Sequence, residues 1–160
     1  MTRTEFEAVY ARFGPKLRNF ISRQIGNSDT AADLLQDTFV RLLRSESIEY
    51  RSDAELASYL FRTAHSIVVD HIRRERRTPP WWPAFLSVKT AASGFDGVFR
   101  LLKPRDRTLL WLAYVEEMSH DEIGRIIDVE PRSVKVMLFR ARKRLAAKLK
   151  EHGLDSEVFA

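Results

Sequence analysis

The 160-residue chain is long enough for one ordinary domain or two small ones, and its 44% apolar and 31% charged content is that of a folded globular protein. A formal net charge of +5 favours an anionic partner, and the absence of cysteine excludes disulfides and thiolate metal sites. The first residues, "MTRTEF", lack the apolar core of a signal peptide, and the longest apolar run, "LLWLAYV" at 109–115, is too short to span a bilayer. These features predict a cytoplasmic protein without membrane insertion.

The first two periodic segments have the apolar spacing of helices. One is predicted over about residues 4–25 and ends at Gly26, and Ser28 or Asp29 can cap the second, which runs to about residue 44. The positions expected to be buried recur every three or four residues: Phe6, Val9, Phe13, Leu17, Phe20 and Ile21 in the first helix, then Ala31, Leu35, Phe39 and Leu42 in the second.

A third helix is predicted over about residues 53–76, after a loop at 45–52. Its expected inner face consists of Leu60, Ala64, Ile67, Val68 and His71, and its outer face carries Tyr59, Arg62, Ser66, Val69 and Arg73. The cations on the outer face can hold phosphates, and the aromatic ring and the hydroxyl can touch an unstacked base.

The composition changes after Arg77. The run "TPPWWP" at 78–83 cannot lie inside a helix, and the small and polar residues that follow continue to Gly94. With no alternating strand pattern in the chain, the sequence predicts an all-α protein of two small helical domains, at 1–77 and 95–160, joined by a linker at 78–94.

The second half has the pattern of a helix-turn-helix motif. A short helix is expected from Phe95, and Pro104 starts another at its first position. Ser119 and Glu122 have the spacing of a capping box, the run "DVE" breaks the helix that they open, and Pro131 marks the start of a long basic one. A helix, a short break and a long basic helix form the motif that enters the major groove of DNA.

The long basic helix is two-sided. Residues 132–150 contain eight Lys and Arg and no acid, yet one side keeps an apolar stripe of Val134, Leu138, Ala141, Leu145 and Leu149. The candidate DNA contacts on the other side are Arg132, Ser133, Lys135, Val136, Phe139, Arg140 and Lys143, with Arg142 and Arg144 further along for phosphates or solvent. A basic helix at a membrane surface is the alternative, and the apolar stripe argues against it because it continues the packing of Leu112, Ile123 and Ile126.

Four sequence blocks, in this order, resemble the extracytoplasmic-function (ECF) group of sigma-70-type transcription initiation factors. The resemblance runs from about Phe6 to Leu149 and begins with "FEAVYARFGPKLRNF". The run "DLLQDTFVRLLR" at 33–44 matches the family motif that binds core polymerase, and "SYLFRTAHSIVVDHIRRERR" at 58–77 is similar to the helix for melting and −10 recognition. The block at 102–145 resembles region four, which reads the −35 element.

The resemblance implies three partners and three sets of residues. Core RNA polymerase would bind Asp33, Leu34, Gln36, Asp37, Val40 and Arg41, and the −10 element would bind Tyr59, Arg62, His65, Ser66, Arg73, Arg76 and Arg77. Promoter melting would need a pocket for an unstacked base, and residues 48–56 are the expected wall of that pocket. The −35 element of promoter DNA would bind the long basic helix, and an anti-sigma factor would be the third partner. The chain departs from the family pattern at Asp128, where the family has Gly, at Glu130, where it has Ser, and at His65 and Ser66, where it has Arg and Asn.

Other functions fit the sequence less well. A stand-alone helix-turn-helix regulator would bind DNA without polymerase, and a basic module without specificity would bind all duplexes equally at matched salt. His71 and Glu75 have the i, i+4 spacing of metal ligands, with His65 and Asp70 nearby, but no third ligand lies at a useful spacing. We therefore predict no catalytic residue, no metal and no cofactor.

Overall fold

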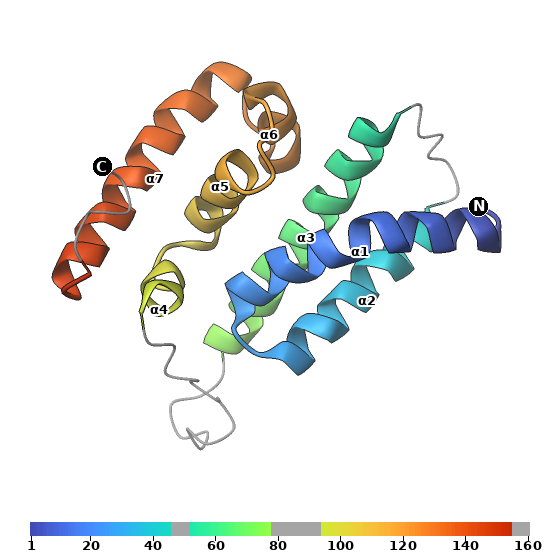
Figure 1. The fold of residues 1–160 in the computed structure, drawn as a ribbon, viewed down its shortest axis with the longest axis horizontal. Coiled ribbons are helices and arrows are strands. Elements are labelled where there is room, and N and C mark those ends of the chain that lie inside the picture. The colour runs from blue at the N-terminus through green and yellow to red at the C-terminus, as the bar shows by residue number, and fades with distance from the viewer. Residues whose placement is uncertain (46–51, 78–93, 155–160) are drawn as a thin grey trace. The chain divides into compact units, whose positions relative to one another are not determined.

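The computed structural model describes residues 1–45, 52–77 and 94–154, and all regular structure in these ranges is helical (Figure 1). The helices divide between two compact units. The first unit consists of α1 (Arg3–Ile25), α2 (Ser28–Arg44) and α3 (Asp53–Arg76), and the second of α4 (Phe95–Phe99), α5 (Pro104–Tyr114), α6 (His120–Ile127) and α7 (Pro131–Glu151). The predicted all-α class is confirmed. The linker, up to residue 93, and the part of the proposed base wall at 48–51 lie outside the described residues.

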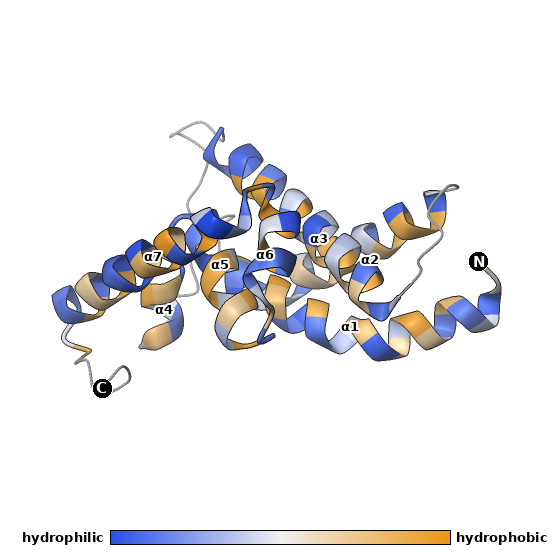
Figure 2. Cartoon of the chain, turned by 90° about the horizontal axis from the view of Figure 1, so that it is seen from above, coloured by the Kyte–Doolittle hydropathy of each residue, from blue (hydrophilic) through white to orange (hydrophobic). Residues whose placement is uncertain are grey.

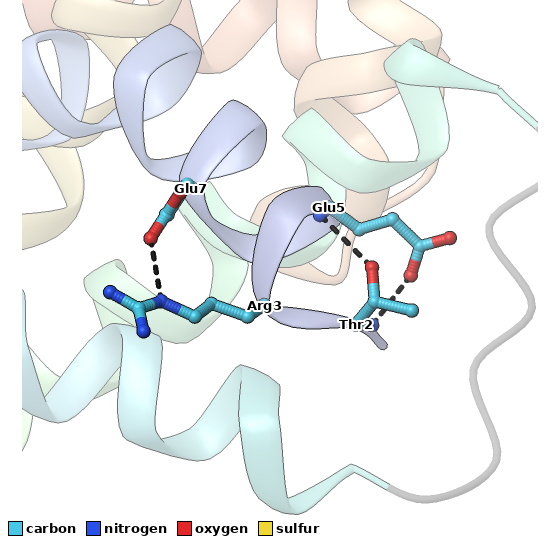
Figure 3. Close-up of polar contacts among 4 residues, drawn as sticks. All are labelled: Thr2, Arg3, Glu5 and Glu7. Carbon is cyan, nitrogen blue, oxygen red and sulfur yellow. Dashed lines mark hydrogen bonds and ion pairs between the residues drawn. The ribbon is translucent and has the colours of Figure 1, made fainter.

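Helix α1 begins at a capping box (Figure 3). The Glu5 backbone N–H donates to Thr2 Oγ1 at 3.2 Å, and the Thr2 backbone N–H donates to Glu5 Oε2 at 2.7 Å. The hydrogen bond from the Thr2 backbone lowers the pKa of the Glu5 carboxyl, because it stabilises the charged form. One turn on, Arg3 Nε lies 2.9 Å from Glu7 Oε1. The two capping-box bonds satisfy backbone N–H groups that the start of a helix otherwise leaves without a partner.

The N-cap of α2 is Asn27, which differs from the sequence prediction. Gly26 has φ +75° and ends α1 in the left-handed conformation. Asn27 follows in an extended conformation, and its Oδ1 accepts from the backbone N–H groups of Asp29 and Thr30 at 3.0 and 3.1 Å. The prediction of Ser28 or Asp29 as the cap was wrong, because the turn at Gly26 already gives Asn27 the extended backbone that an N-cap requires.

The first unit is a three-helix bundle in which each helix packs on the other two. The predicted stripes of α1 and α2 are buried from Phe13 onward, whereas Phe6 and Val9, near the start of α1, are half-buried. In α3 the aliphatic positions of the predicted inner face are buried, and Phe61 is buried beside them. The Phe61 ring packs edge-on against Phe20, with the ring centroids 5.5 Å apart. This aromatic pair sits at the centre of the bundle and fixes α1 against α3.

The turn of the second unit is tight. The predicted capping box between Ser119 and Glu122 is present at the start of α6. Asp128 ends α6 with φ +58°, in the left-handed region that Asp adopts more readily than most residues. The Val129 backbone N–H donates to the Gly124 carbonyl oxygen at 2.9 Å, and a Cβ atom on Gly124 would lie 2.6 Å from the Val129 carbonyl oxygen. Only glycine fits at that position without a shift of the turn.

Helix α7 packs on the three other helices of its unit. All five positions of its predicted apolar stripe are buried. Its C-terminal half closes a core with α4 and α5 that consists of Val98, Phe99, Leu102, Leu110, Ala141, Leu145 and Leu149. The stripe is therefore occupied by the protein's own core. Among the described helices, not one has the length and apolar content needed to cross a bilayer.

Candidate nucleic-acid interface

Helix α2 carries an acidic face. Asp33, Gln36, Asp37 and Arg41 are exposed on it and Val40 is half-buried. The two carboxylates lie one helical turn apart, so they form a ridge of negative charge beside the apolar Val40 side chain. We call these five residues the acidic face.

Leu34 does not belong to this face. We expected Leu34 to contact a partner directly. It is only 4% exposed and lies in the core of the first unit, so this expectation was wrong. The reason is helical spacing: Leu34 lies one turn from both Ala31 and Thr38, which are fully buried. The Thr38 hydroxyl donates back to the Leu34 carbonyl oxygen at 2.8 Å. The burial of Leu34 supports the acidic face from beneath.

The outer face of α3 is basic and runs to the end of the helix. Arg62, Ser66, Arg73, Arg76 and Arg77 are exposed on it, and Tyr59 and His65 are half-buried. The Tyr59 hydroxyl lies 3.5 Å from the Arg41 carbonyl oxygen in α2. One residue predicted to bind the −10 element therefore lies beside one predicted to bind polymerase.

The pair considered as metal ligands is an ordinary side-chain contact. His71 Nε2 lies 3.2 Å from Glu75 Oε1, and the imidazole is 19% exposed. Within residues 1–45, 52–77 and 94–154, no three side chains of the metal-binding types gather. The described residues give no support to a metal site.

Helix α7 presents a second charged surface, which we call the basic face. Arg132, Lys135, Val136, Phe139, Arg140 and Lys143 are exposed on it, and Ser133 is half-buried. Blue and orange residues alternate along the α7 ribbon in Figure 2, as expected of a helix with one apolar and one polar side. The Lys143 ammonium lies 4.6 Å from the centroid of the Phe139 ring, at cation–π distance. The exposed apolar centre of this face, Val136 and Phe139, is thus bordered by cations.

The N-terminus of α7 holds an ion pair that the sequence analysis did not predict. Glu130 is the N-cap residue, but its side chain makes no capping hydrogen bond. Instead Glu130 Oε2 accepts from Arg132 Nε at 2.5 Å, and both side chains remain largely exposed.

Arg144 was expected to serve phosphates or solvent, and the structure corrects this. Its Nη1 donates to both carboxylate oxygens of Asp106 in α5, at 3.1 and 3.0 Å. The Asp106 side chain is only 8% exposed and that of Arg144 is 53% exposed. Sequence spacing gave no signal for a pair 38 residues apart. Arg144 therefore fixes α7 to α5 and does not belong to the basic face.

Two family models match the chain in the order of its two units. The description of the first is "Sigma-70 region 2", and it matches residues 9–78. The description of the second is "Sigma-70, region 4", and it matches residues 96–145. The first match contains the acidic face of α2 and the basic outer face of α3. The second contains α5, α6 and the basic face of α7.

Relatives of known identity match over nearly the whole chain. The RNA polymerase sigma factor CarQ of Myxococcus xanthus is 26% identical, over 94% of this chain and 92% of its own length. The ECF RNA polymerase sigma factor SigM of Bacillus subtilis is 24% identical, over 94% of this chain and 98% of its own length.

Solved structures share the fold. The sigma factor RpoE of Bartonella quintana, solved with the anti-sigma factor NepR, has a TM-score of 0.71 and 22% identity, over 91% of this chain and 97% of its own. CnrH, solved with the cytosolic domain of CnrY, has a TM-score of 0.70 and 25% identity, over 94% of this chain and 90% of its own.

Proposed function

The chain belongs to the ECF group of sigma-70-type RNA polymerase sigma factors, and we propose that it binds core polymerase through α2 and reads promoters through α3 and α7. The observation that carries the proposal is the placement of an acidic face in the region 2 match and of a helix-turn-helix with a basic face in the region 4 match. We assign residues 1–77 to region two, 78–94 to the linker and 95–160 to region four.

The acidic face suits a basic helical partner. Asp33 and Asp37 offer two carboxylates one turn apart, and Val40 adds an apolar contact one turn further along. In the family the partner is the pair of clamp helices on the largest polymerase subunit. Charge complementarity of this kind steers association and fixes the register of the two surfaces.

The basic outer face of α3 suits the −10 element. Taking a base out of the duplex costs about a few kcal/mol, and stacking it on an aromatic ring or on an Arg guanidinium returns roughly 1–3 kcal/mol. One stacked base therefore balances the cost only when backbone contacts contribute as well. Arg62 and the arginines of the last turn of α3 are placed to make such contacts with phosphates.

The basic face of α7 suits the major groove at the −35 element. A recognition helix enters the groove with its first turns, so Arg132 and Ser133 lead and Lys135 and Arg140 follow. The exposed Phe139 can contact the methyl group of a thymine, a contact that the C5-methyl group makes available only in the major groove. Lys143, one turn beyond Phe139, is the candidate for a phosphate contact.

The neighbours Lys143 and Arg144 are expected to respond differently to loss of charge. Lys143→Gln should lower the salt slope of promoter binding by about one unit and lower stability by no more than about 1 kcal/mol, the size of its exposed cation–π contact with Phe139. Arg144→Gln should leave the slope unchanged and destabilise the second unit by about 1–2 kcal/mol, a value reduced from that of a fully buried pair because Arg144 is half exposed. Binding titrations at several salt concentrations, together with thermal melts, test both. If both substitutions lowered the salt slope equally, Arg144 would contact DNA and its structural role as the partner of Asp106 would be contradicted.

Two further properties follow from the family. RpoE and CnrH were solved with an anti-sigma factor and with the cytosolic domain of CnrY, and we propose that an anti-sigma factor likewise controls this chain. Sigma-70 factors are initiation factors rather than enzymes, so we assign no catalytic activity to the chain. We place it in the cytoplasm, where core polymerase and the chromosome are.

A stand-alone regulator is the alternative, and the two proposals differ in their need for polymerase. The sigma-factor proposal is supported by the region 2 match, because a lone helix-turn-helix regulator needs no acidic face of this kind. The test is co-purification of the chain with core polymerase. Specific DNA binding by the chain with no affinity for core polymerase would favour the regulator.

A further inference from the structure

The N-cap residue of α7, Glu130, makes no side-chain capping hydrogen bond, and the same is true of Gly94 at α4 and Lys103 at α5. Thr2, Asn27, Ser52 and Ser119 each use the side chain to accept hydrogen bonds from the backbone of the helix that follows. Glu130 does not, and its carboxylate binds Arg132 instead. An exposed ion pair contributes little to stability, and a capping Ser or Asp would contribute more. The contact with Arg132, rather than a capping bond, is therefore the interaction that the Glu130 side chain makes at the start of α7.

The pair leaves the guanidinium ready for a second contact. Arg132 Nε–H is the donor to Glu130, so the four N–H groups on the two Nη atoms are available to another acceptor. Guanine offers two acceptors side by side in the major groove, O6 and N7, and Arg binds them as a fork. A guanidinium that is already oriented loses less rotamer freedom when it binds, which favours the bidentate contact over an undirected contact with a phosphate.

The carboxylate has a second oxygen. Glu130 Oε2 is the acceptor for Arg132, and Oε1 can accept from an amino group on a base edge, either cytosine N4 or adenine N6. The same negative charge repels phosphates, so it penalises placement of the tip of α7 against the DNA backbone. Together the pair offers two donors, one N–H on each Nη atom of Arg132, and one acceptor, Glu130 Oε1, and the ion pair holds them close to one another.

We propose that Glu130 is a specificity-determining residue for the −35 element: it holds Arg132 in position to bind guanine and reads a cytosine or adenine amino group beside that guanine. The proposal rests on the assignment of α7 as the −35 recognition helix. It adds Glu130 to the residues that contact bases and adds the base beside the guanine to the sequence that is recognised. The predicted ligand is a guanine with an amino-bearing base at the adjacent position.

The test uses holoenzyme, formed from the full chain and core polymerase, on promoters with a constant −10 element and a randomised −35 element. Holoenzyme that contains the unaltered chain should select guanine at one −35 position and adenine or cytosine at the adjacent position. Arg132→Ala should reduce the guanine preference roughly 10- to 100-fold. Arg132→Lys, which keeps the charge but loses the fork, should reduce it as well while preserving the salt slope.

The decisive variant is Glu130→Ser, because serine can cap α7 and so should not lower stability. We expect the guanine preference to fall about two- to fivefold, the size of one exposed ion pair, and the preference at the adjacent position to disappear. Glu151→Ser, which removes the same charge at the other end of α7, is the matched control and should change neither position.

Each other outcome identifies a different error. If Glu130→Ser leaves both positions unchanged, Glu130 has no role in specificity and the proposal is wrong. If Arg132→Ala weakens all sequences equally, Arg132 is a phosphate contact and the proposal is also wrong. If the unaltered holoenzyme shows no preference at any −35 position, the assignment of α7 itself fails, which is a separate result.

Discussion

The double variant Asp33→Lys/Asp37→Lys should bind core RNA polymerase at least about 100-fold more weakly than the unaltered chain. Removal of one charge from a close interfacial pair costs about 2–5 kcal/mol, and reversal of the charge adds repulsion to that loss. Both carboxylates lie on the exposed acidic face of α2, so the substitutions leave no buried partner without its contact. The fold should therefore survive while the interface fails.

The matched control is Glu7→Lys/Asp70→Lys. These two carboxylates are also exposed in the first unit and lie outside the acidic face, and their reversal changes the net charge by the same amount. Competition for core polymerase against a labelled sigma factor measures both variants, and thermal melts check that both fold. If the two double variants lose affinity equally, general charge repulsion explains the effect and the acidic face has no special role.

A second large effect is expected at Gly124, where Gly124→Ala should destabilise the second unit by about 2–3 kcal/mol. The new Cβ would lie 2.6 Å from the Val129 carbonyl oxygen, and that atom belongs to the backbone of the turn and has no rotamer that would move it away. Relief of the contact requires the turn between α6 and α7 to open, which moves the basic face relative to α6. Affinity for the −35 element should fall with the stability.

Gly14→Ala provides the comparison. Gly14 is also buried within a helix, but the nearest neighbour of its Cβ would be the Tyr10 ring, at 3.5 Å, an ordinary contact distance. The higher helix propensity of alanine should then stabilise the first unit by up to about 1 kcal/mol. Hydrogen exchange of the amides in α3 and α7 reports on the two units separately. Destabilisation of similar size at both glycines would contradict the account of the tight turn.

Most of the fold could be predicted because its signals are local. The α7 stripe at Val134, Leu138 and Leu145 has a clear helical period, and the capping box at Ser119 is a pattern of four residues. The cap at Asn27 was missed because the choice among neighbouring cap residues depends on the backbone turn at Gly26. Phe61 was missed because it lies beside the stripe that was counted in α3, and only its contact with Phe20 identifies it as core.

The candidate site was predicted less completely, because it depends on contacts between distant or adjacent side chains. Helical period separated Asp33 and Asp37 from the core, whereas Leu34 was assigned to a partner because it lies in the matched motif, although it is one turn from the buried Ala31. The sequence predicted that Arg144 is one more cation of a basic helix, because its partner Asp106 lies in another helix. Glu130 was noted only as a departure from the Ser of the family pattern, and its bond to Arg132 is seen only in the structure.

The central claim is that this chain confers promoter specificity on core polymerase through two separate units, and reconstituted transcription tests it most directly. Purified chain and core polymerase are combined with templates in which both the −35 and the −10 elements are randomised at constant spacing. We expect transcripts that start at a fixed distance from a selected −10 element, that require a selected −35 element, and that disappear with Asp33→Lys/Asp37→Lys. Selection of the same DNA sequences by the chain alone, with no transcript when core polymerase is added, would contradict the claim and identify a stand-alone DNA-binding regulator.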